Sequence, residues 1–302
     1  MAQVTTHLIV AQDAEALLSS IRALPAHERP LYVGQTHHWI HAPHEISVKA
    51  LLGDGSHVTK WDYLLTFRTP PTTADPLALP STLEKLIKHK WSLTATADPA
   101  ALDALPVERK RRLTSTPPPL PAGWSPSDHS ALDAAIPPED LEVSLALNSH
   151  RLGADRANDR PVILKSYLRA FGTTHPGPIL MQNFDSSHPG QRPRFFNYIE
   201  TFSASVGIKY GGEPAIFSQD PTDWSSRAEE GEITVQEAQD SGTYGVEGGT
   251  KVGWEDVALV WYPSIWHFAA MLDDPAYAQA DREFKGGVLR DGPLILTTEV
   301  EV

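Results

Sequence analysis

The 302-residue chain contains no cysteine, and this absence removes several kinds of chemistry together. Disulfides, thiolate metal sites and a cysteine nucleophile are all excluded. The chain also lacks any apolar run near the roughly 18 residues of a membrane-spanning helix, so we expect no membrane segment. Its opening residues, MAQVTTHLIVAQDAEALL, show no basic start before a long apolar stretch, so we expect no signal peptide and a cytoplasmic protein.

Motifs that mark several common enzyme classes are missing as well. The sequence has no GxGxxG, no Walker loop and no GxSxG, so nucleotide binding, kinase activity and serine hydrolysis have no support. Basic residues are scarce: 25 Lys and Arg stand against 38 Asp and Glu, for a formal net charge of −13. An acidic chain repels phosphate groups, so we expect neither a nucleic-acid partner nor an anionic membrane surface. The one basic cluster, residues 109–112, lies at the end of a predicted helix and fits a solvated last turn.

Proline content divides the chain. Seven prolines fall within residues 114–138, a density that disfavours a continuous helix or a central strand. The sequence therefore predicts an N-terminal domain over 1–113, a linker with connecting helices over 114–172, and a C-terminal domain over 173–302. A second polar and glycine-rich stretch, residues 219–253, fits an insertion between two strands, either a lid over a site or a loop without a role.

The C-terminal domain has the clearer pattern of secondary structure. Hydrophobic periodicity predicts a strand, a helix, two strands, a helix and a final strand. The expected bounds are 178–185, 192–207, 209–219, 256–263, 264–285 and 292–302. Gly207 is expected to end the first helix, the Gly211-Gly212 pair to bend the second strand, and Ser264 to cap the second helix.

The N-terminal domain repeats this order more weakly. Strands are expected at 6–11, 30–41, 60–68 and 91–97, with helices at 13–24 and 81–90. Two further helices are expected between the domains, at 137–153 and 158–172, although the alternating apolar residues of 141–147 would also suit a strand. The chain is therefore predicted to be α+β, with two ferredoxin-like β-α-β-β-α-β repeats.

Three segments of the C-terminal domain resemble a known family. The segments GPILMQNFD, YIETFSASVGIKYGGEPAIFS and WEDVALVWYPSIWHFAAMLDDPAYAQADREFKGGVLRDGPLIL, within residues 175–300, are similar to the DUF1330 family of dimeric α/β-barrel proteins. The tandem form resembles fungal members. The resemblance implies two sheets that pack into a barrel, here within one polypeptide, with a ligand pocket between a sheet and its helices. The superfamily spans cyclases, isomerases, monooxygenases and haem proteins, so the resemblance implies a fold more firmly than an activity.

Polar side chains on the predicted strands 178–185 and 256–263, and on the helix that follows, are the candidate catalytic groups. Tyr262 could donate its hydroxyl to a substrate carbonyl, although a core tyrosine at a rim also fits. His267 lies in a first helical turn, which suits a neutral acid/base or a haem ligand, although a structural histidine bonded to a backbone carbonyl also fits. Asn183 shares a strand face with Met181 and Asp185, and is expected either to orient a carbonyl or enolate or to tie down the next loop.

Apolar and aromatic side chains are expected to form the walls of the same pocket. Substrate contacts are predicted for Phe195, Phe202, Trp261, Trp266 and His38. His38 belongs to the dense cluster THHWIHAPHE (36–45), in which His37 and His41 would lie about 13 Å apart on one strand face. That separation is too large for a shared metal ion, so we expect no metal site there.

Together these features predict a cofactor-free enzyme that acts on a hydrophobic, carbonyl-bearing small molecule by acid/base chemistry, as a cyclase, isomerase or lyase. Two alternatives stay open. One is a haem-binding oxidoreductase or dehydratase with His267 as the proximal ligand. The other is a non-catalytic small-molecule binding protein or dimerisation module, and a homodimer is compatible with the family resemblance.

Overall fold

The computed structural model describes residues 1–41, 43, 51, 60–69, 77–125, 160–223, 245–247, 250–252 and 254–302. The N-terminal half contains β1 (Ala2–Ala11), α1 (Ala14–Ala23), β2 (Tyr32–His41), β3 (Tyr63–Thr69), α3 (Ser81–Glu84), β4 (Ile87–Ala97) and α4 (Pro99–Thr114). The C-terminal half contains α6 (Arg160–Thr174), β5 (Ile179–Ser187), α7 (Arg192–Thr201), α8 (Gly207–Lys209), β6 (Glu213–Asp223), β7 (Gly245–Glu247), β8 (Thr250–Val252), β9 (Asp256–Tyr262), α10 (Ile265–Leu272), α11 (Pro275–Phe284), β10 (Leu289–Asp291) and β11 (Leu294–Glu299).

The long strands form a closed antiparallel barrel to which both halves contribute. Nine strands pair in the order β10-β5-β11-β2-β3-β1-β4-β6-β9, and an additional β5–β9 pairing closes the ring, leaving β10 on its edge. The halves join where β2 pairs with β11 and where β4 pairs with β6. Within the halves the strand orders are β2-β3-β1-β4 and β11-β5-β9-β6. The α+β class is therefore confirmed, and one polypeptide completes the barrel.

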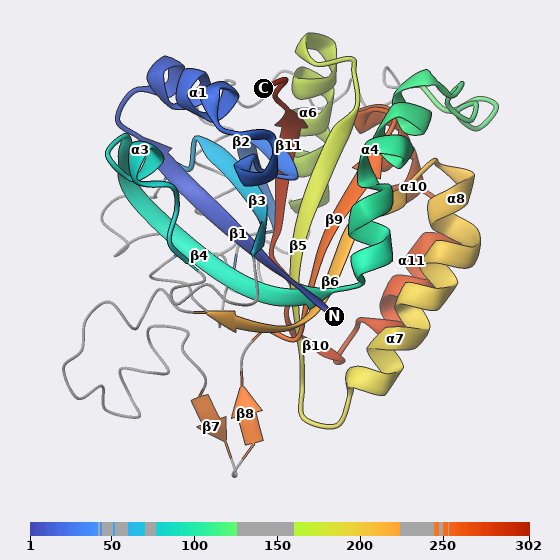
Figure 1. The fold of residues 1–302 in the computed structure, drawn as a ribbon. Helices are drawn as coiled ribbons and strands as arrows, with labels where there is room; N and C mark the ends of the chain where they lie inside the picture. The colour runs from blue at the N-terminus through green and yellow to red at the C-terminus, as the bar shows by residue number, and fades with distance from the viewer. Residues whose placement is uncertain are drawn as a thin grey trace.

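Two layers of apolar side chains follow from the alternation of each strand. One set of residues fills the barrel interior and includes Leu8, Leu64, Trp91, Phe184 and Trp261. The opposite faces of the same strands are covered by helices: α1 and α3 lie on one side of the barrel, and α7, α10 and α11 lie on another (Figure 1). No helix in the described ranges is both long and apolar enough to cross a membrane.

Several expected bounds are wrong, and each has a local cause. The helix expected at 81–90 stops at Glu84, because Ile87 and the residues after it pair with β1 and extend β4 toward the N-terminus. The helix expected at 264–285 is two helices, α10 and α11. Pro275 has no backbone N–H to continue α10, and the Asp274 carboxylate accepts a hydrogen bond from the Ala276 N–H at 2.8 Å, so α11 starts there. Ser264 occupies the cap position of α10, but its hydroxyl contacts the His267 side chain and caps no backbone N–H.

The glycine pair has a different role from the one expected. The helix runs through Gly207, from α7 by way of a π-helical turn, η4 (Phe202–Val206), into α8, and it ends at Gly211, whose φ is +70°. The Gly212 N–H donates to the Gly207 carbonyl at 2.7 Å and the Gly211 N–H donates to the Ile208 carbonyl at 3.0 Å, the Schellman pattern. The strand expected from 209 therefore begins only at Glu213. The helix expected at 158–172 is present as α6, whereas 137–153 lies outside the described residues, as does most of 219–253.

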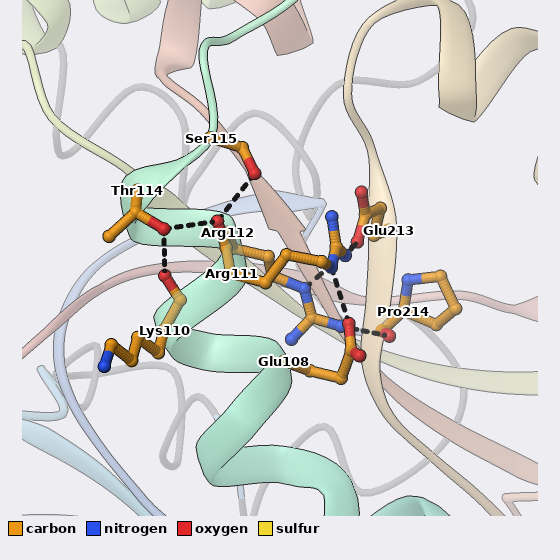
Figure 2. Close-up of polar contacts among 8 residues, drawn as sticks. All are labelled: Glu108, Lys110, Arg111, Arg112, Thr114, Ser115, Glu213 and Pro214. Carbon is orange, nitrogen blue, oxygen red and sulfur yellow. Dashed lines mark hydrogen bonds and ion pairs between the residues drawn. The ribbon is translucent and has the colours of Figure 1, made fainter.

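The basic end of α4 is paired rather than solvated. Figure 2 shows Arg111 and Arg112 reaching Glu213 at the start of β6. The Arg112 side chain is only 8% exposed; its Nε lies 3.2 Å from Glu213 Oε2, and its Nη2 donates to the Pro214 carbonyl at 3.1 Å. Arg109 pairs with Glu299 at 2.9 Å. The cluster thus fastens an N-terminal helix to two strands of the C-terminal half.

Arg112→Ala should lower the free energy of unfolding by about 1.5 kcal/mol, because it removes one of the two guanidinium partners of Glu213 and the charged donor to the Pro214 carbonyl in a partly buried place. Urea unfolding at pH 7.5 measures the change. Lys110→Ala, at an exposed neighbouring position on the same helix, is the matched control and should change the value by less than about 0.5 kcal/mol. Equal effects of the two substitutions would contradict the structural role given to Arg112.

Candidate functional site

A cavity of about 290 Å³ lies on the outer face of the C-terminal half, between the strands β5 and β9 and the helices α7, α10 and α11. Its lining is mostly apolar, with polar groups from a few places. The polar and ionisable lining residues are His41, Asn183, Asp185, Tyr198, Ser203, Tyr262, Tyr277 and Lys285. The cavity is therefore an apolar chamber with a small number of polar groups, as is usual for small-molecule sites.

Strand alternation explains why these polar groups meet. On β5, Leu180 and Phe184 point into the barrel, so Met181, Asn183 and Asp185 point the other way, toward the helices. The neighbouring strand β9 pairs antiparallel with β5, and its residue Tyr262 lines the same cavity. Asn183 and Tyr262, which the sequence predicts to share a pocket, are thus brought together.

Asp185 is the least satisfied polar group in the cavity. Its residue is 9% exposed, and none of the described residues donates a hydrogen bond to its carboxylate. Burial raises the pKa of Asp185 to about 7, and the nearby carboxylates of Asp256, Asp291 and Glu255 act in the same direction, while Lys285 opposes them. A carboxyl group in this state exchanges its proton close to neutral pH.

Lys285, just beyond the end of α11, supplies positive charge to the same cavity. Its side chain is 25% exposed, its Nζ lies 3.9 Å from Asp281 Oδ1, and it lies 4.4 Å from the centre of the Tyr198 ring. Burial lowers the pKa of Lys285, but its interactions with Tyr277, Asp185 and Asp281 outweigh burial and raise it. The ammonium group therefore stays protonated at neutral pH.

The hydroxyl of Tyr262 and the amide of Asn183 are held only loosely by the protein. The Tyr262 hydroxyl donates to Met271 Sδ at 3.5 Å, and thioether sulfur is a weak acceptor. Burial raises the pKa of Tyr262 well above its ordinary value, so the hydroxyl keeps its proton. The Asn183 amide contacts the carbonyls of Met181 and Ala258 at 3.4 and 3.5 Å, both long for hydrogen bonds. Both groups can therefore turn toward a ligand at little cost.

His267 has no place in this lining. Its Nε2 donates to the Pro118 carbonyl at 3.0 Å and its Nδ1 accepts from the Ser264 hydroxyl at 2.8 Å, so both ring nitrogens are occupied. Burial lowers the pKa of His267, so the ring stays neutral. The imidazole fastens the proline-rich segment to α10, and this anchoring corresponds to the structural alternative described for it from the sequence.

Of the five predicted substrate contacts, Phe195 and Phe202 line the cavity. The other three lie elsewhere. Trp261 belongs to the barrel interior, Trp266 packs beside Trp124 with 6.5 Å between ring centres, and His38 packs edge-on against Tyr167 at 4.3 Å. The prediction that Trp261 lines the pocket is wrong because of strand alternation. Trp261 is next to Tyr262 on one strand, so its side chain must point to the opposite face.

Four polar side chains that line the cavity are not among the predicted site residues: Asp185, Lys285, Tyr198 and Tyr277. The signal for Asp185 was present, since it shares its strand face with Asn183. Tyr198 lies on the predicted helix 192–207, where its spacing from Phe195 and Phe202 places it on the same side. Tyr277 and Lys285 reach the cavity because the chain breaks between α10 and α11, where the sequence predicts one continuous helix.

The histidines of β2 take part in structural contacts. His37 Nε2 lies 2.8 Å from Thr298 Oγ1, and its ring packs 4.9 Å from that of His175. Within the described ranges, no group of three or more His, Cys, Asp or Glu residues has the arrangement of a metal site. His44 and Glu45 lie outside those ranges.

No family model matches the chain, and no curated protein is similar to it. Solved structures with some likeness include RPA0582, a protein of unknown function from Rhodopseudomonas palustris, which is 23% identical over 42% of this chain and 85% of that one, with a TM-score of 0.28. The methylated RPA0582 protein is 23% identical over 41% of this chain and 82% of that one, with a TM-score of 0.29. A Lactobacillus acidophilus NCFM protein, provisionally described as a monooxygenase, is 8% identical over 99% of this chain and 93% of that one, with a TM-score of 0.42. At these values the likenesses carry no argument about activity.

Proposed function

We propose that the chain is a tandem α/β-barrel protein built from two ferredoxin-like repeats, over 1–113 and 173–302, joined by a connecting segment over 114–172. The strand order supports the repeats, because in chain order each half arranges its four long strands as fourth, first, third and second. The three segments quoted above support a DUF1330-like C-terminal repeat. In this proposal the C-terminal repeat holds the functional cavity.

We further propose that this cavity performs acid/base chemistry on a hydrophobic, carbonyl-bearing small molecule without a cofactor. The observation that carries the proposal is Asp185, a buried carboxylate without a hydrogen-bond donor among the described residues, facing an apolar cavity of about 290 Å³. An ionisable group placed this way destabilises the fold, so it calls for a functional reason. A base whose pKa is near the working pH is the most effective kind.

The proposed step is a proton abstraction next to a carbonyl group. The Asp185 carboxylate takes the proton from the α-carbon, the C–H electron pair moves into the new C=C bond, and the carbonyl oxygen becomes an enolate. Tyr262 and Asn183 act as donors to that oxygen, because each has a donor held only by weak contacts. Return of the proton from Asp185 to another carbon completes an isomerisation. In a cyclisation the enolate carbon bonds to a second carbonyl carbon, whose C=O π pair moves to its oxygen, and that alkoxide takes the proton back from Asp185.

The haem alternative finds no support in the position of His267. An axial ligand needs the lone pair of a ring nitrogen, yet Nε2 carries the proton donated to Pro118 and Nδ1 accepts from Ser264. A haem ligand at this position would have to break the link between α10 and the proline-rich segment. A non-catalytic binding protein would use the same cavity. A measurement of turnover distinguishes it from an enzyme.

Deuterium uptake tests the proposed chemistry without knowledge of the natural substrate. In D2O, the protein should accelerate exchange of the α-protons of two-ring ketones such as 2-tetralone, followed by NMR. Asp185→Asn should slow the catalysed exchange about tenfold or more, since it removes the base. The rate should rise with pH and level off above about 7, because the ionised form of Asp185 is the active one.

Asp103→Asn removes an exposed carboxylate from the N-terminal half and is the control; it should exchange at the wild-type rate. Tyr262→Phe should give an intermediate rate. If wild-type protein and Asp185→Asn exchange at the same rate at pH 8, the acid/base proposal is wrong and the binding-protein alternative is preferred.

A further inference from the structure

We propose that the cavity selects planar molecules of about two aromatic rings that carry a negatively charged oxygen group, a carboxylate or a phenolate, which Lys285 binds. The inference deepens the proposed function by naming the size, shape and charge of the substrate, and it rests on that function only for the claim that the bound molecule reacts. Three independent features carry it: volume, wall geometry and charge.

The volume fits two rings. A protein cavity of about 150 Å³ accommodates benzene. The cavity beside β5, at about 290 Å³, is roughly twice that size. Twice the benzene-sized cavity corresponds to about 12 heavy atoms, so one ring would leave half of the cavity empty and a naphthalene skeleton with a carboxylate is a good match.

The wall formed by α7 and η4 is aromatic. The rings of Phe195 and Tyr198 have centres 5.9 Å apart with an angle of 12° between their planes. The rings of Tyr198 and Phe202 are also 5.9 Å apart, at 27°. Three stacked rings thus line one side of the cavity, and an aromatic molecule can pack against them offset or edge-on.

The positive charge of the cavity lining comes from Lys285. Among the residues that line the cavity, all of them within the described ranges, it is the one Lys or Arg. Its Nζ is 3.9 Å from the Asp281 carboxylate, beyond hydrogen-bond distance, and otherwise faces the Tyr198 ring, so its N–H donors have no close oxygen acceptor among the described residues. A ligand oxygen anion supplies that acceptor, and a charge-assisted hydrogen bond in a partly buried place is strong.

Asp185 couples the binding of such an anion to a proton. When Asp185 is neutral, Lys285 gives the cavity a net positive charge, and when Asp185 ionises the two charges cancel. Other charged groups around Asp185 are Glu255 and Asp256 at the start of β9 and Asp291 on β10. His41, from β2, is a further ionisable side chain that lines the same cavity. Anion affinity should therefore fall as the pH rises through about 7.

Calorimetric titration at pH 6 with 2-naphthoate, 2-naphthamide and benzoate tests the inference. Wild-type protein should bind 2-naphthoate about tenfold more tightly than the uncharged 2-naphthamide, and more tightly than the one-ring benzoate. Lys285→Gln should bring the naphthoate-to-naphthamide ratio close to one, while Lys285→Arg keeps the preference. Arg282→Gln removes a positive charge three residues earlier on α11, at an exposed position, and should leave the ratio unchanged. Binding of 2-naphthamide to Lys285→Gln serves as the measure that this variant is folded.

Repeating the titration at pH 8 tests whether the pH dependence comes from Asp185, with His41→Gln as the comparison variant. Naphthoate is ionised at both pH values, since carboxyl groups titrate near pH 4. Affinity should drop between pH 6 and pH 8 in the wild type and in His41→Gln, but not in Asp185→Asn. Equal affinities for naphthoate and naphthamide, no measurable naphthoate binding at millimolar concentration, or a charge preference that survives Lys285→Gln would each overturn the inference. A preserved preference without any deuterium exchange would instead overturn the proposed reaction and leave the binding site intact.

Discussion

Asp185→Asn should stabilise the protein by about 4 kcal/mol at pH 8, an unusual outcome for a substitution inside a fold. Burial raises the pKa of Asp185 from its ordinary value of 3.8 to about 7, so the folded state binds this proton more tightly than the unfolded chain does. A gap of about 3 pH units at about 1.4 kcal/mol each is about 4 kcal/mol. The contribution of Asp185 to the free energy of unfolding is fully present below pH 3.8, where the carboxyl is neutral in both states, and it is lost as the pH rises toward 7. Asparagine resembles the neutral carboxyl in shape and never ionises.

Urea unfolding at pH 4 and pH 8 measures this effect. The difference between Asp185→Asn and wild type should be close to zero at pH 4 and reach its full value above pH 7, because only there is the wild-type carboxylate charged. Asp103→Asn, at a surface position whose side chain is 66% exposed, should show no such growth with pH. A variant that is no more stable than wild type at pH 8 would mean that Asp185 ionises without strain. Stabilisation together with loss of proton exchange would identify Asp185 as a residue kept for function at the expense of stability.

The fold was largely predictable because its strands alternate and its helices follow proline and glycine signals. The strand 256–263 and the closing strand near 292–302 were recognised from apolar alternation alone, and the barrel contains both. The boundary between α10 and α11 has a sequence signal as well, because Asp274 followed by Pro275 is a typical helix start. The helical periodicity across 264–285 nevertheless favoured one continuous helix. The short α3 was harder, since the residues after Leu86 are placed by pairing with β1, an interaction with a distant part of the sequence.

The sequence predicts part of the site, namely the residues that lie on strands. Asn183 and Tyr262 reach one cavity because the period of two fixes which face a strand residue occupies. His267 was misplaced because the direction of a side chain in a first helical turn depends on its partners. Here those partners are Ser264 and the Pro118 carbonyl, 149 residues away along the chain. Lys285 reaches the cavity only because α11 folds back after Asp274, and no local pattern encodes that return.

The register of the two halves shows how they differ at the positions of Asn183 and Asp185. The last residue of β3, Thr69, pairs with Gln3, as the last residue of β9, Tyr262, pairs with Ile179. Counting along β1 and β5 from these pairs, His7 takes the position of Asn183 and Ile9 takes that of Asp185. Ile9 is fully buried in the apolar layer beneath α1. At this position the N-terminal half thus has a hydrocarbon side chain where the C-terminal half has the unsatisfied carboxylate.

His7, at the position that matches Asn183, leads to the second large prediction. Its Nδ1 lies 2.8 Å from the Ser92 hydroxyl, and the residue is 1% exposed. Burial, with a smaller contribution from Lys90, lowers the pKa of His7 from 6.5 to about 3, so the folded state holds the neutral ring while the unfolded chain takes up a proton below pH 6.5. Stability from this group is complete above pH 6.5 and lost as the pH falls. At pH 5 the loss is about 2 kcal/mol, from 1.5 pH units at about 1.4 kcal/mol each.

His7→Gln should remove this acid sensitivity. The measurement is the change in the free energy of unfolding between pH 7.5 and pH 5, obtained from urea titrations. The wild type should lose about 2 kcal/mol more than the variant over this interval, whatever the starting stability of the variant at pH 7.5. Asp185 and His37 titrate in both proteins, so their contributions cancel in the comparison. His27→Gln, at a side chain that is 81% exposed, should follow the wild type. If His7→Gln loses as much stability as the wild type between the two pH values, His7 accepts its proton without unfolding, and the polar pair with Ser92 is more open to water than its burial indicates.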